Sequence, residues 1–189
     1  MSRRPRGTIV HSFAHVTSKG IRGLPIYFCD AEYEWFLARL EEYAKHYGIR
    51  LHAFCLLTNH FHLLLEAGPQ PISKFMHRLL YRYARHINRR HQHFGHLFAD
   101  RFWAKPCDRD VYLLGTIRYI HRNPVLAGLS KTPEGYRWSS HSVYLGAQAL
   151  PWVATDSLAY FHQDRQRAVE AYARFVWPEG QTAEGTQTS

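Results

Sequence analysis

The sequence predicts an α+β fold: a ferredoxin-like split βαβ arrangement with an antiparallel sheet, an added helix and a C-terminal extension. Three observations predict it. The expected elements run in the order strand, helix, strand, strand, helix, strand, helix. Thr58 and Asn59 form a two-residue turn between two apolar segments, so residues 49–66 make an antiparallel hairpin. The helices carry apolar stripes, which indicates that they pack on one face of the sheet.

The first strand and the first helix are clearly marked. Residues 8–20 are rich in β-branched and aromatic side chains, as in many strands, and end at a glycine. The helix begins with Asp30 as its N-cap and with Glu32 and Glu34 in its first turn, where acidic side chains interact favourably with the helix dipole. Gly48 ends the helix, because glycine readily adopts the left-handed conformation found there.

A second helix and a short strand follow the hairpin, whose strands are residues 49–57 and 60–66. After a break at residues 68–71, an apolar stripe with helical spacing runs through Ile72, Phe75, Met76, Leu79, Leu80, Tyr83 and Ile87. Residues 101–107 form a short strand. Pro106 places this strand at an edge of the sheet, because proline cannot donate a ladder hydrogen bond.

A further helix begins at Asp108 or Asp110, runs to about Asn123, and is ended by Pro124 and Gly128. The chain then divides into four expected segments. They are a basic arm (1–7), a main domain (8–130), a C-terminal accessory extension (131–177) with one amphipathic helix near 164–176, and a disordered tail (178–189).

Composition restricts the class of protein. No apolar run approaches the roughly 18 residues that span a bilayer, and the first residues lack the apolar stretch of a signal peptide, so we expect a cytoplasmic protein without a membrane partner. Cys29, Cys55 and Cys107 are odd in number and far apart, which excludes a CxxC zinc module and a fully paired set of intrachain disulfides.

The formal net charge of +9 and the pI of about 9.7 indicate an anionic partner, most often a nucleic acid. Basic residues gather in the N-terminal arm and along the second helix, opposite its apolar stripe. We expect phosphate contacts from Arg3, Arg4, Arg6, Lys74, Arg78, Arg82, Arg85, Arg89 and Arg90. The alternative for any one of them is a solvated surface charge. Phe94, Phe98 and Trp103 either stack on unpaired bases or belong to the core.

His60 and His62 are the strongest candidates for metal ligands. Side chains two apart on a strand point to the same face, so two imidazoles can bind one divalent ion if a third ligand comes from elsewhere. The alternative is chance, because the chain contains 14 histidines. A second group, His86, His91, His93 and His96, lacks the helical spacing of a shared site and favours solvated or phosphate-contacting histidines.

The helix over residues 111–124 has a polar face beside its apolar stripe. Tyr112, Thr116, Tyr119 and Asn123 recur at spacings of four, three and four, so they share this face. A tyrosine and an amide one turn apart can place a nucleophile and a metal ligand at one site. A tyrosine at a helix boundary can equally belong to an amphipathic core.

Five blocks of sequence, taken together, resemble one family. They are "HVTSKG" (15–20), "GIRLHAFCLLTNHFHLLLE" (48–66), "HINRRHQHFGHLFADRF" (86–102), "YIHRNPVLAGL" (119–129) and "WSSHSVYLG" (138–146). They resemble, in order and with plausible spacing, the single-tyrosine transposases of the HUH class (IS200-like transposases). The similarity is closest to the branch of REP-associated tyrosine transposases, to whose C-terminal extension the last block is similar.

The resemblance implies a ferredoxin-like nuclease domain that cleaves and rejoins single-stranded, hairpin-containing DNA through a covalent 5′-phosphotyrosine. It implies that His60 and His62 bind a divalent metal ion with Asn123, and that Tyr119 is the nucleophile on a catalytic helix. The ion would be Mg²⁺ or Mn²⁺, and a site with two histidines suits Mn²⁺ better. Thr58 departs from the proline common in relatives, which affects the turn and no ligand.

Arg122 stands where relatives often have an apolar residue, and would add a phosphate contact. The resemblance also implies a bacterial protein, associated with the nucleoid when bound to DNA, that acts as a monomer or a homodimer. Two alternatives differ in class. One is a domesticated protein that binds hairpin DNA but has lost cleavage. The other is a structural zinc protein, for which a fourth ligand is missing. The DNA target and the physiological metal stay open.

Overall fold

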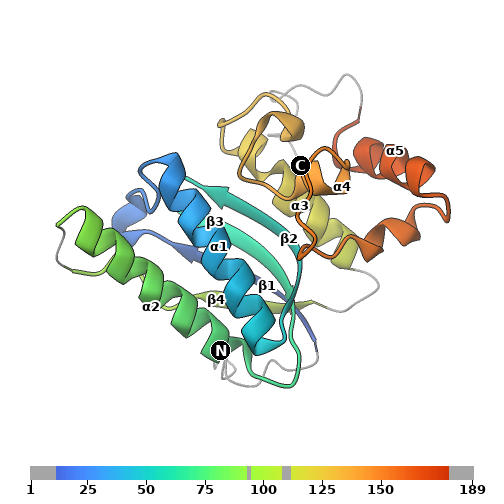
Figure 1. Cartoon of the computed structure of the whole chain (residues 1–189). Coiled ribbons are helices and arrows are strands. Elements are labelled where there is room, and N and C mark those ends of the chain that lie inside the picture. Colours follow the sequence, from blue (N-terminus) through green and yellow to red (C-terminus); the bar gives the residue numbers. More distant parts are fainter. Residues whose placement is uncertain (1–11, 93–94, 108–111, 179–189) are drawn as a thin grey trace, which may run out of the picture.

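The computed structural model describes residues 12–92, 95–107 and 112–178, and contains a four-stranded antiparallel sheet with helices on both faces (Figure 1). The main elements are β1 (Phe13–Lys19), α1 (Asp30–Tyr47), β2 (Arg50–Leu57), β3 (His60–Glu66), α2 (Ile72–Arg90), β4 (Trp103–Cys107) and α3 (Leu113–Leu126). The extension adds α4 (His141–Tyr144) and α5 (Arg165–Val176). Short 3₁₀ turns are η2 (Ile21–Gly23), η3 (Pro133–Gly135) and η4 (Asp156–Tyr160). No helix in these ranges is long and apolar enough to cross a membrane.

The strand order β2-β3-β1-β4 confirms the predicted split βαβ arrangement. Strand β3 lies between β1 and β2 and runs antiparallel to both, so the unit β1-α1-β2 is divided by the following strand. The tight turn after β2 places β3 beside β2, as the hairpin pattern predicts. Strand β4 lies at an edge, where Pro106 is tolerated.

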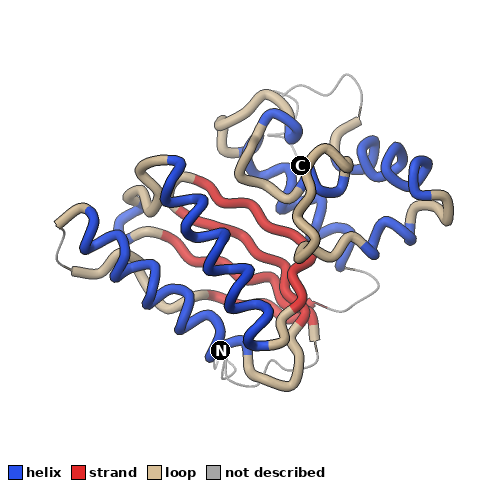
Figure 2. The backbone as a smooth tube through the Cα atoms, viewed as in Figure 1, coloured by secondary structure: helices blue, strands red, loops and turns tan. Residues whose placement is uncertain are grey.

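Helices α1 and α2 lie side by side over one face of the sheet (Figures 1 and 2). The ring of Phe36 on α1 contacts that of Phe61 on β3, with centroids 5.2 Å apart. The expectation that helices pack on one face holds for these two. Helix α3 lies on the other face, because Tyr119 contacts His62, which points away from Phe61 along the strand.

The start of α1 corrects one prediction. Cys29 is the N-cap residue and Asp30 is the first helical residue, without a side-chain capping bond. Glu32 stabilises this end instead, because its carboxylate accepts a hydrogen bond of 2.6 Å from the Phe28 N–H. Only Asp30 and Glu32 are acidic residues of the first turn, so Glu34 lies beyond it. Gly48 ends the helix with φ 64°, as predicted.

Helix α3 extends further than predicted. Pro124 lies inside its last turn and is buried, and the helix continues to Leu126. The N–H groups of Ala127 and Leu129 donate to the carbonyl oxygens of Asn123 and Pro124, each at 2.8 Å, so the end of the helix is still hydrogen-bonded around the proline. The predicted start at Asp108 or Asp110 falls outside the described residues, which place the first helical residue at Leu113.

The C-terminal extension covers the free edge of β2. Leu56 N–H donates to the Trp138 carbonyl at 2.9 Å, and Ser140 N–H donates to the Phe54 carbonyl at 3.0 Å. An exposed edge is a template for unwanted pairing, and this short antiparallel segment occupies it. Trp138 and Tyr172 of the extension belong to the same hydrophobic core as the sheet. Helix α5 starts next to the predicted position, with Asp164 as its N-cap.

Two leucines provide a matched test of this core. Leu40 of α1 is fully buried, whereas Leu24 is 55% exposed. Leu40→Ala should lower the free energy of unfolding by about 2–5 kcal/mol, because it removes buried methyl groups and leaves a cavity. Leu24→Ala should change it by less than about 0.5 kcal/mol. Urea unfolding followed by circular dichroism measures both; equal losses in the two variants would contradict the packing of α1 on the sheet.

Candidate functional site

Three strands present side chains to the face of the sheet that α3 partly covers. In the register, Thr17 of β1 lies between His62 of β3 and Trp103 of β4. Residues two apart on a strand share a face, so His15 and His60 belong to the same surface. This surface holds both histidines that the sequence singled out, together with one histidine that it did not.

His62 is the most buried of the three histidines. Its Nδ1 atom lies 2.9 Å from Nε2 of His15, and the two rings are stacked with centroids 5.1 Å apart. The His60 ring lies edge-on to the His62 ring at 5.0 Å. His62 is 6% exposed, and its Nε2 atom has no hydrogen-bond partner. A buried nitrogen without a partner is unfavourable unless a ligand completes it.

Hydrogen bonds leave the Nε2 atoms of both predicted ligands free. Nδ1 of His60 lies 2.7 Å from Oδ1 of Asn59, which only accepts, so the His60 proton is on Nδ1. If Nδ1–H of His62 likewise donates to His15, both Nε2 atoms carry lone pairs. Partners of this kind fix the tautomer and the ring orientation of metal-binding histidines. With these tautomers, His60 and His62 have the protonation pattern that a divalent cation requires.

Burial keeps these imidazoles neutral. Desolvation, with smaller contributions from His15 and His60, lowers the pKa of His62 to about 3. Desolvation and the charge of Lys105 lower the pKa of His15 to about 4. The pKa of His60 is lowered by the same desolvation and by Lys19. Neutral imidazole is the form that binds a metal ion.

Tyr119 of α3 lies beside this pair. Its ring is 47% exposed, and its centroid is 5.5 Å from that of His62 and 5.8 Å from that of His15, both edge-on. Asn123 is one helical turn further along, 7% exposed, and its amide nitrogen donates to the Tyr119 carbonyl at 2.7 Å. Its amide oxygen is then the atom available as a ligand. The structure brings Tyr119 to the histidines, and records no direct contact of Asn123 with them.

Within the described parts of the chain, no group of three or more His, Cys, Asp and Glu side chains could hold a metal ion. A site at His60 and His62 therefore needs a ligand of another type, and the amide oxygen of Asn123 has suitable chemistry. The described members of the second histidine group form no such site. His86 stacks on Trp35 with centroids 4.4 Å apart, His91 contacts the buried carboxylate of Glu32, and His93 lies outside the described residues.

A pocket of about 310 Å³ opens in front of the histidine pair. It is lined by Thr17, Ser18, Lys19, Gly23, Asn59, His60, His62, Asp100, Arg101 and Trp103. Lys19 and Arg101 are exposed and suited to phosphate, and Trp103 is 46% exposed, so its ring can stack on a base. Sequence reasoning missed His15, Lys19 and Arg101. The signal for His15 and Lys19 was the alternation within β1, which places both on the face of His62.

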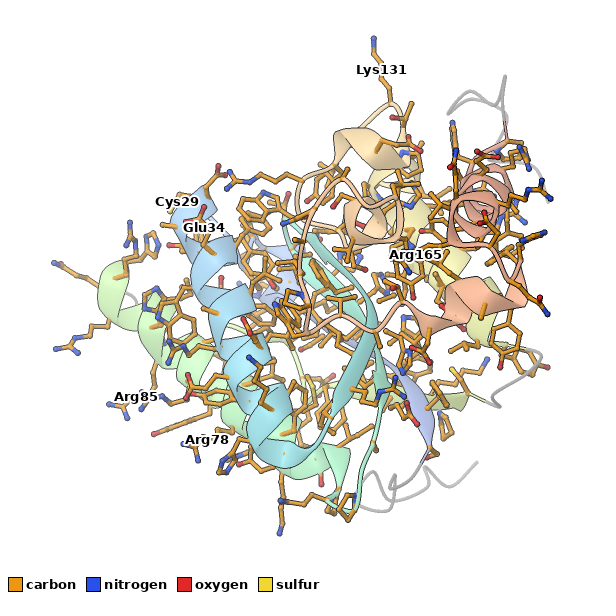
Figure 3. All side chains as sticks on the ribbon, turned by 45° about the vertical axis from the view of Figure 1, so that its right-hand side comes forward. Cys29, Glu34, Arg78, Arg85, Lys131 and Arg165 are labelled. Atoms are coloured by element: carbon orange, nitrogen blue, oxygen red, sulfur yellow. The ribbon has the colours of Figure 1, made fainter. Side chains whose placement is uncertain are left out.

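The predicted basic surface of α2 lies on the opposite side of the sheet from this pocket. All six of its cations are exposed: Lys74, Arg78, Arg82, Arg85, Arg89 and Arg90. Figure 3 shows Arg78 and Arg85 directed away from the body of the protein. Helix α2 contains no acidic residue. A shallow hollow of about 420 Å³ is lined by Tyr47, Lys74, His77, Arg78, Tyr81 and Arg82.

The remaining predicted phosphate contacts do not belong to α2. Arg3, Arg4 and Arg6 lie outside the described residues. The guanidinium of Arg122 is half-buried and lies 5.3 Å from the centroid of the Trp177 ring. Desolvation and the neighbouring Arg118 lower the pKa of Arg122. Its phosphate contact stays a prediction, and its observed interaction is with the end of the extension.

Fold and site together define a ferredoxin-like domain in which paired histidines of a central strand face a tyrosine on an added helix. The family model described as Transposase IS200 like matches residues 28–123, about half of the chain, so the chain belongs to the IS200-like transposase family. The resemblance seen in the sequence is confirmed at this level. No curated protein matches the chain in sequence.

Two solved structures match the chain in the structural comparison. A REP-associated tyrosine transposase bound to a REP hairpin superposes with a TM-score of 0.66 at 16% identity, over 82% of this chain and 91% of that one. A proposed transposase from Deinococcus radiodurans R1 has a TM-score of 0.44 at 19% identity, over 65% of this chain and 97% of that one. The fold shared with the first structure covers 82% of this chain, more than the residues 28–123 that the family model matches.

The buried histidines predict a pH dependence of stability. His15 and His62 have pKa values of about 4 and 3 in the folded protein, below the usual 6.5, so the unfolded chain binds protons first as pH falls. Stability should therefore decrease as pH drops below about 6.5. His62→Gln should reduce the slope of unfolding free energy against pH by up to about 1.4 kcal/mol per unit between about pH 6 and 4.

Urea unfolding between pH 4 and 7.5 measures this slope. The control is His46→Gln, because His46 is exposed on α1. An unchanged slope in His62→Gln, or an equal change in both variants, would contradict the buried, neutral state of His62.

Proposed function

We propose that this protein is a metal-dependent transposase and endonuclease that cleaves and rejoins single-stranded, hairpin-containing DNA through a covalent bond to Tyr119. One observation carries the proposal: the exposed Tyr119 ring lies 5.5 Å from the ring of His62, a histidine whose buried Nε2 atom lacks a partner. A potential nucleophile therefore lies beside a potential metal ligand that also lines the pocket, in a chain of the IS200-like transposase family. Such a protein would act in the bacterial cytoplasm, at the nucleoid.

Nε2 of His60, Nε2 of His62 and the amide oxygen of Asn123 would hold the divalent ion. Their free lone pairs fit such an ion, and the two imidazoles favour Mn²⁺ over Mg²⁺. When bound, the ion supplies positive charge that polarises the scissile phosphate and offsets charge in the transition state. Lys19 and Arg101 line the same pocket and would bind the flanking phosphates.

Tyr119 would carry the covalent step. Its phenolic oxygen loses the proton to solvent and attacks phosphorus, and the bond from phosphorus to the 3′ oxygen breaks. The products are a 5′-phosphotyrosine and a strand that ends in a 3′-OH. A 3′-OH can then attack the phosphotyrosine and displace the tyrosine oxygen, so strands are rejoined without an external energy source. The exposure of Tyr119 allows a DNA strand to reach it.

The basic face of α2 would bind DNA outside the catalytic pocket. Its cations are exposed, and its own sequence contains no acidic residue. Arg90 lies 3.5 Å from Glu32 of α1, whereas the other five have no acidic partner within the described residues, which favours phosphate as their partner. The solved relative in fold carries a REP hairpin, which supports hairpin DNA as the class of partner. A hairpin bound at α2 and a single strand in the pocket would occupy opposite sides of the sheet.

A covalent adduct tests the chemistry. With hairpin-containing single-stranded DNA and Mn²⁺ or Mg²⁺, the wild-type protein should form a DNA adduct that survives a denaturing gel. Tyr119→Phe should form none, because it lacks the attacking oxygen. Tyr112→Phe is the matched control, since Tyr112 is the N-cap residue of the same helix and is 57% exposed.

Equal adduct in wild type and Tyr119→Phe would contradict the assignment of the nucleophile. Tight hairpin binding without any adduct, whichever metal is present, would favour the domesticated DNA-binding protein instead. Loss of the adduct on chelation, with recovery on addition of Mn²⁺, is the result expected for a metal-dependent enzyme.

Removal of a phosphate contact should also show in the salt dependence of binding. Arg78→Ala should weaken hairpin binding and lower the slope of log K against log[salt] by about 1. Arg165→Ala, an exposed arginine of α5, is the control for net charge (Figure 3). Fluorescence anisotropy at several salt concentrations measures both slopes; equal slopes in the two variants would exclude a specific role for α2.

A further inference from the structure

A buried polar cluster joins the back of α3 to the C-terminal extension, away from the proposed metal site. His121 and His141 are fully buried, and Tyr172 is 1% exposed. Nε2 of His121 lies 2.8 Å from Oγ of Ser140, and its Nδ1 lies 2.7 Å from the hydroxyl of Tyr172. The same hydroxyl is 2.6 Å from Nδ1 of His141, whose Nε2 is 3.1 Å from the carboxylate of Glu134.

These contacts form one chain of hydrogen bonds, whose direction we assign from Glu134. The hydrogen bond from His141 lowers the pKa of Glu134 to about 2, so Glu134 is an ionised carboxylate and can only accept. Nε2–H of His141 donates to it, Nδ1 of His141 accepts from the Tyr172 O–H, and the Tyr172 oxygen accepts from Nδ1–H of His121. Nε2 of His121 then accepts from the Ser140 O–H at 2.8 Å, a shorter contact than the 3.3 Å between Oγ of Ser140 and the Phe54 carbonyl oxygen.

The chain ends on the backbone of β2. Oγ of Ser140 accepts from the Phe54 N–H at 2.8 Å, while the Phe54 carbonyl accepts from the Ser140 N–H at 3.0 Å. The four ring nitrogens of His121 and His141 and the hydroxyls of Tyr172 and Ser140 then each have a partner. A satisfied buried network of this kind permits one arrangement of its members, whereas an apolar contact would tolerate sliding and rotation.

The position of His121 on α3 connects this network to Tyr119. Residues two apart are about 200° apart round a helix, so His121 lies on the side of α3 opposite to Tyr119 and Asn123. Rotation of α3 by about 20° would displace a side chain at a radius of about 5–6 Å by about 2 Å. A displacement of about 1 Å at a reacting group can cost about a hundredfold in rate.

We infer that His121 is a positioning residue: the chain from Ser140 through His121, Tyr172 and His141 to Glu134 sets the rotation of α3 and thereby the approach of Tyr119 to the histidine pair. The inference rests on the proposed function. It assigns to the C-terminal extension a part in strand cleavage that does not require contact with DNA. Tyr172 comes from α5 and Glu134 from η3, so two separate segments of the extension are needed to complete the chain.

Two buried tyrosines of the extension provide a matched test. Tyr172→Phe removes the central hydroxyl of the chain. Tyr144→Phe removes an equally buried hydroxyl, which bonds to the His52 carbonyl at 2.9 Å and to Ser157 at 3.0 Å but to no group on α3. Both variants should lose stability to urea. Only Tyr172→Phe should slow adduct formation at saturating hairpin DNA and Mn²⁺, by at least about tenfold, with hairpin affinity unchanged within about twofold.

Glu134 provides a second test at the surface, where folding is least affected. Its side chain is 44% exposed. Glu134→Gln keeps an oxygen acceptor for His141 and should retain the rate of adduct formation, whereas Glu134→Ala should lower it. Equal rates in wild type, Tyr172→Phe and Glu134→Ala, or equal losses in Tyr172→Phe and Tyr144→Phe, would overturn the inference.

The protonation of His121 can be measured without DNA, which separates this inference from the proposed function. Nitrogen-15 NMR of the imidazoles in the full chain should show His121 protonated at Nδ1, and Tyr172→Phe should abolish or shift that signal. A proton on Nε2 of His121 would overturn the chain. If wild-type protein forms no adduct while the Nδ1–H signal is present, the proposed function fails and the network itself stands.

Discussion

Strand β3 is covered on both of its faces, and the chemistry of the candidate site depends on this double coverage. Phe61 and Leu63 pack toward α1 and α2, while His62 faces α3 and is 6% exposed. A histidine on a strand with one solvated face would be hydrated and would titrate near its usual pKa. Here desolvation lowers the pKa of His62 and keeps its ring neutral. Its Nε2 atom is buried and has no hydrogen-bond partner. Coverage by α3 therefore keeps His62 neutral and also places Tyr119 beside it.

Helix α3 is held by side-chain contacts on two sides. Tyr119 lies against the histidines on the exposed side, and His121 is bonded to Ser140 and Tyr172 on the buried side. Further along, Arg118 and Arg122 lie over the rings of Phe175 and Trp177. The extension therefore completes the environment of the helix that carries Tyr119. It also pairs with the edge of β2, so the same extension covers the sheet edge and contacts α3.

The sheet separates two surfaces suited to nucleic acid. The pocket beside the histidine pair is lined by three charged residues, one exposed tryptophan and the two histidines, whereas α2 has six exposed cations and no acid. The first arrangement suits a single strand whose bases can stack and whose phosphate must be placed accurately. The second suits the closely spaced phosphates of a folded stem. A hairpin with a single-stranded flank has both features in one molecule.

The sequence by itself determined the order of the strands and helices, because alternation, helical stripes and turn residues are local properties. It also determined that His60 and His62 share a face, since a strand has a period of two. The predictions were wrong at the ends of two helices. Glu32, and not Asp30, stabilises the start of α1, because its carboxylate accepts a hydrogen bond from the Phe28 N–H. Pro124 lies within α3, whose last carbonyl groups accept hydrogen bonds from residues beyond the helix.

Only the tertiary structure decided which residues meet. His15 contacts His62 because β1 pairs with β3 over a separation of 47 residues, and no local pattern reports such pairing. The choice of face for α3, the stacking of Arg122 on Trp177 and the link from His121 to Glu134 likewise depend on segments brought together by burial of the core. The physical reason is that periodicity fixes the direction of a side chain, whereas its partner is set by packing and desolvation.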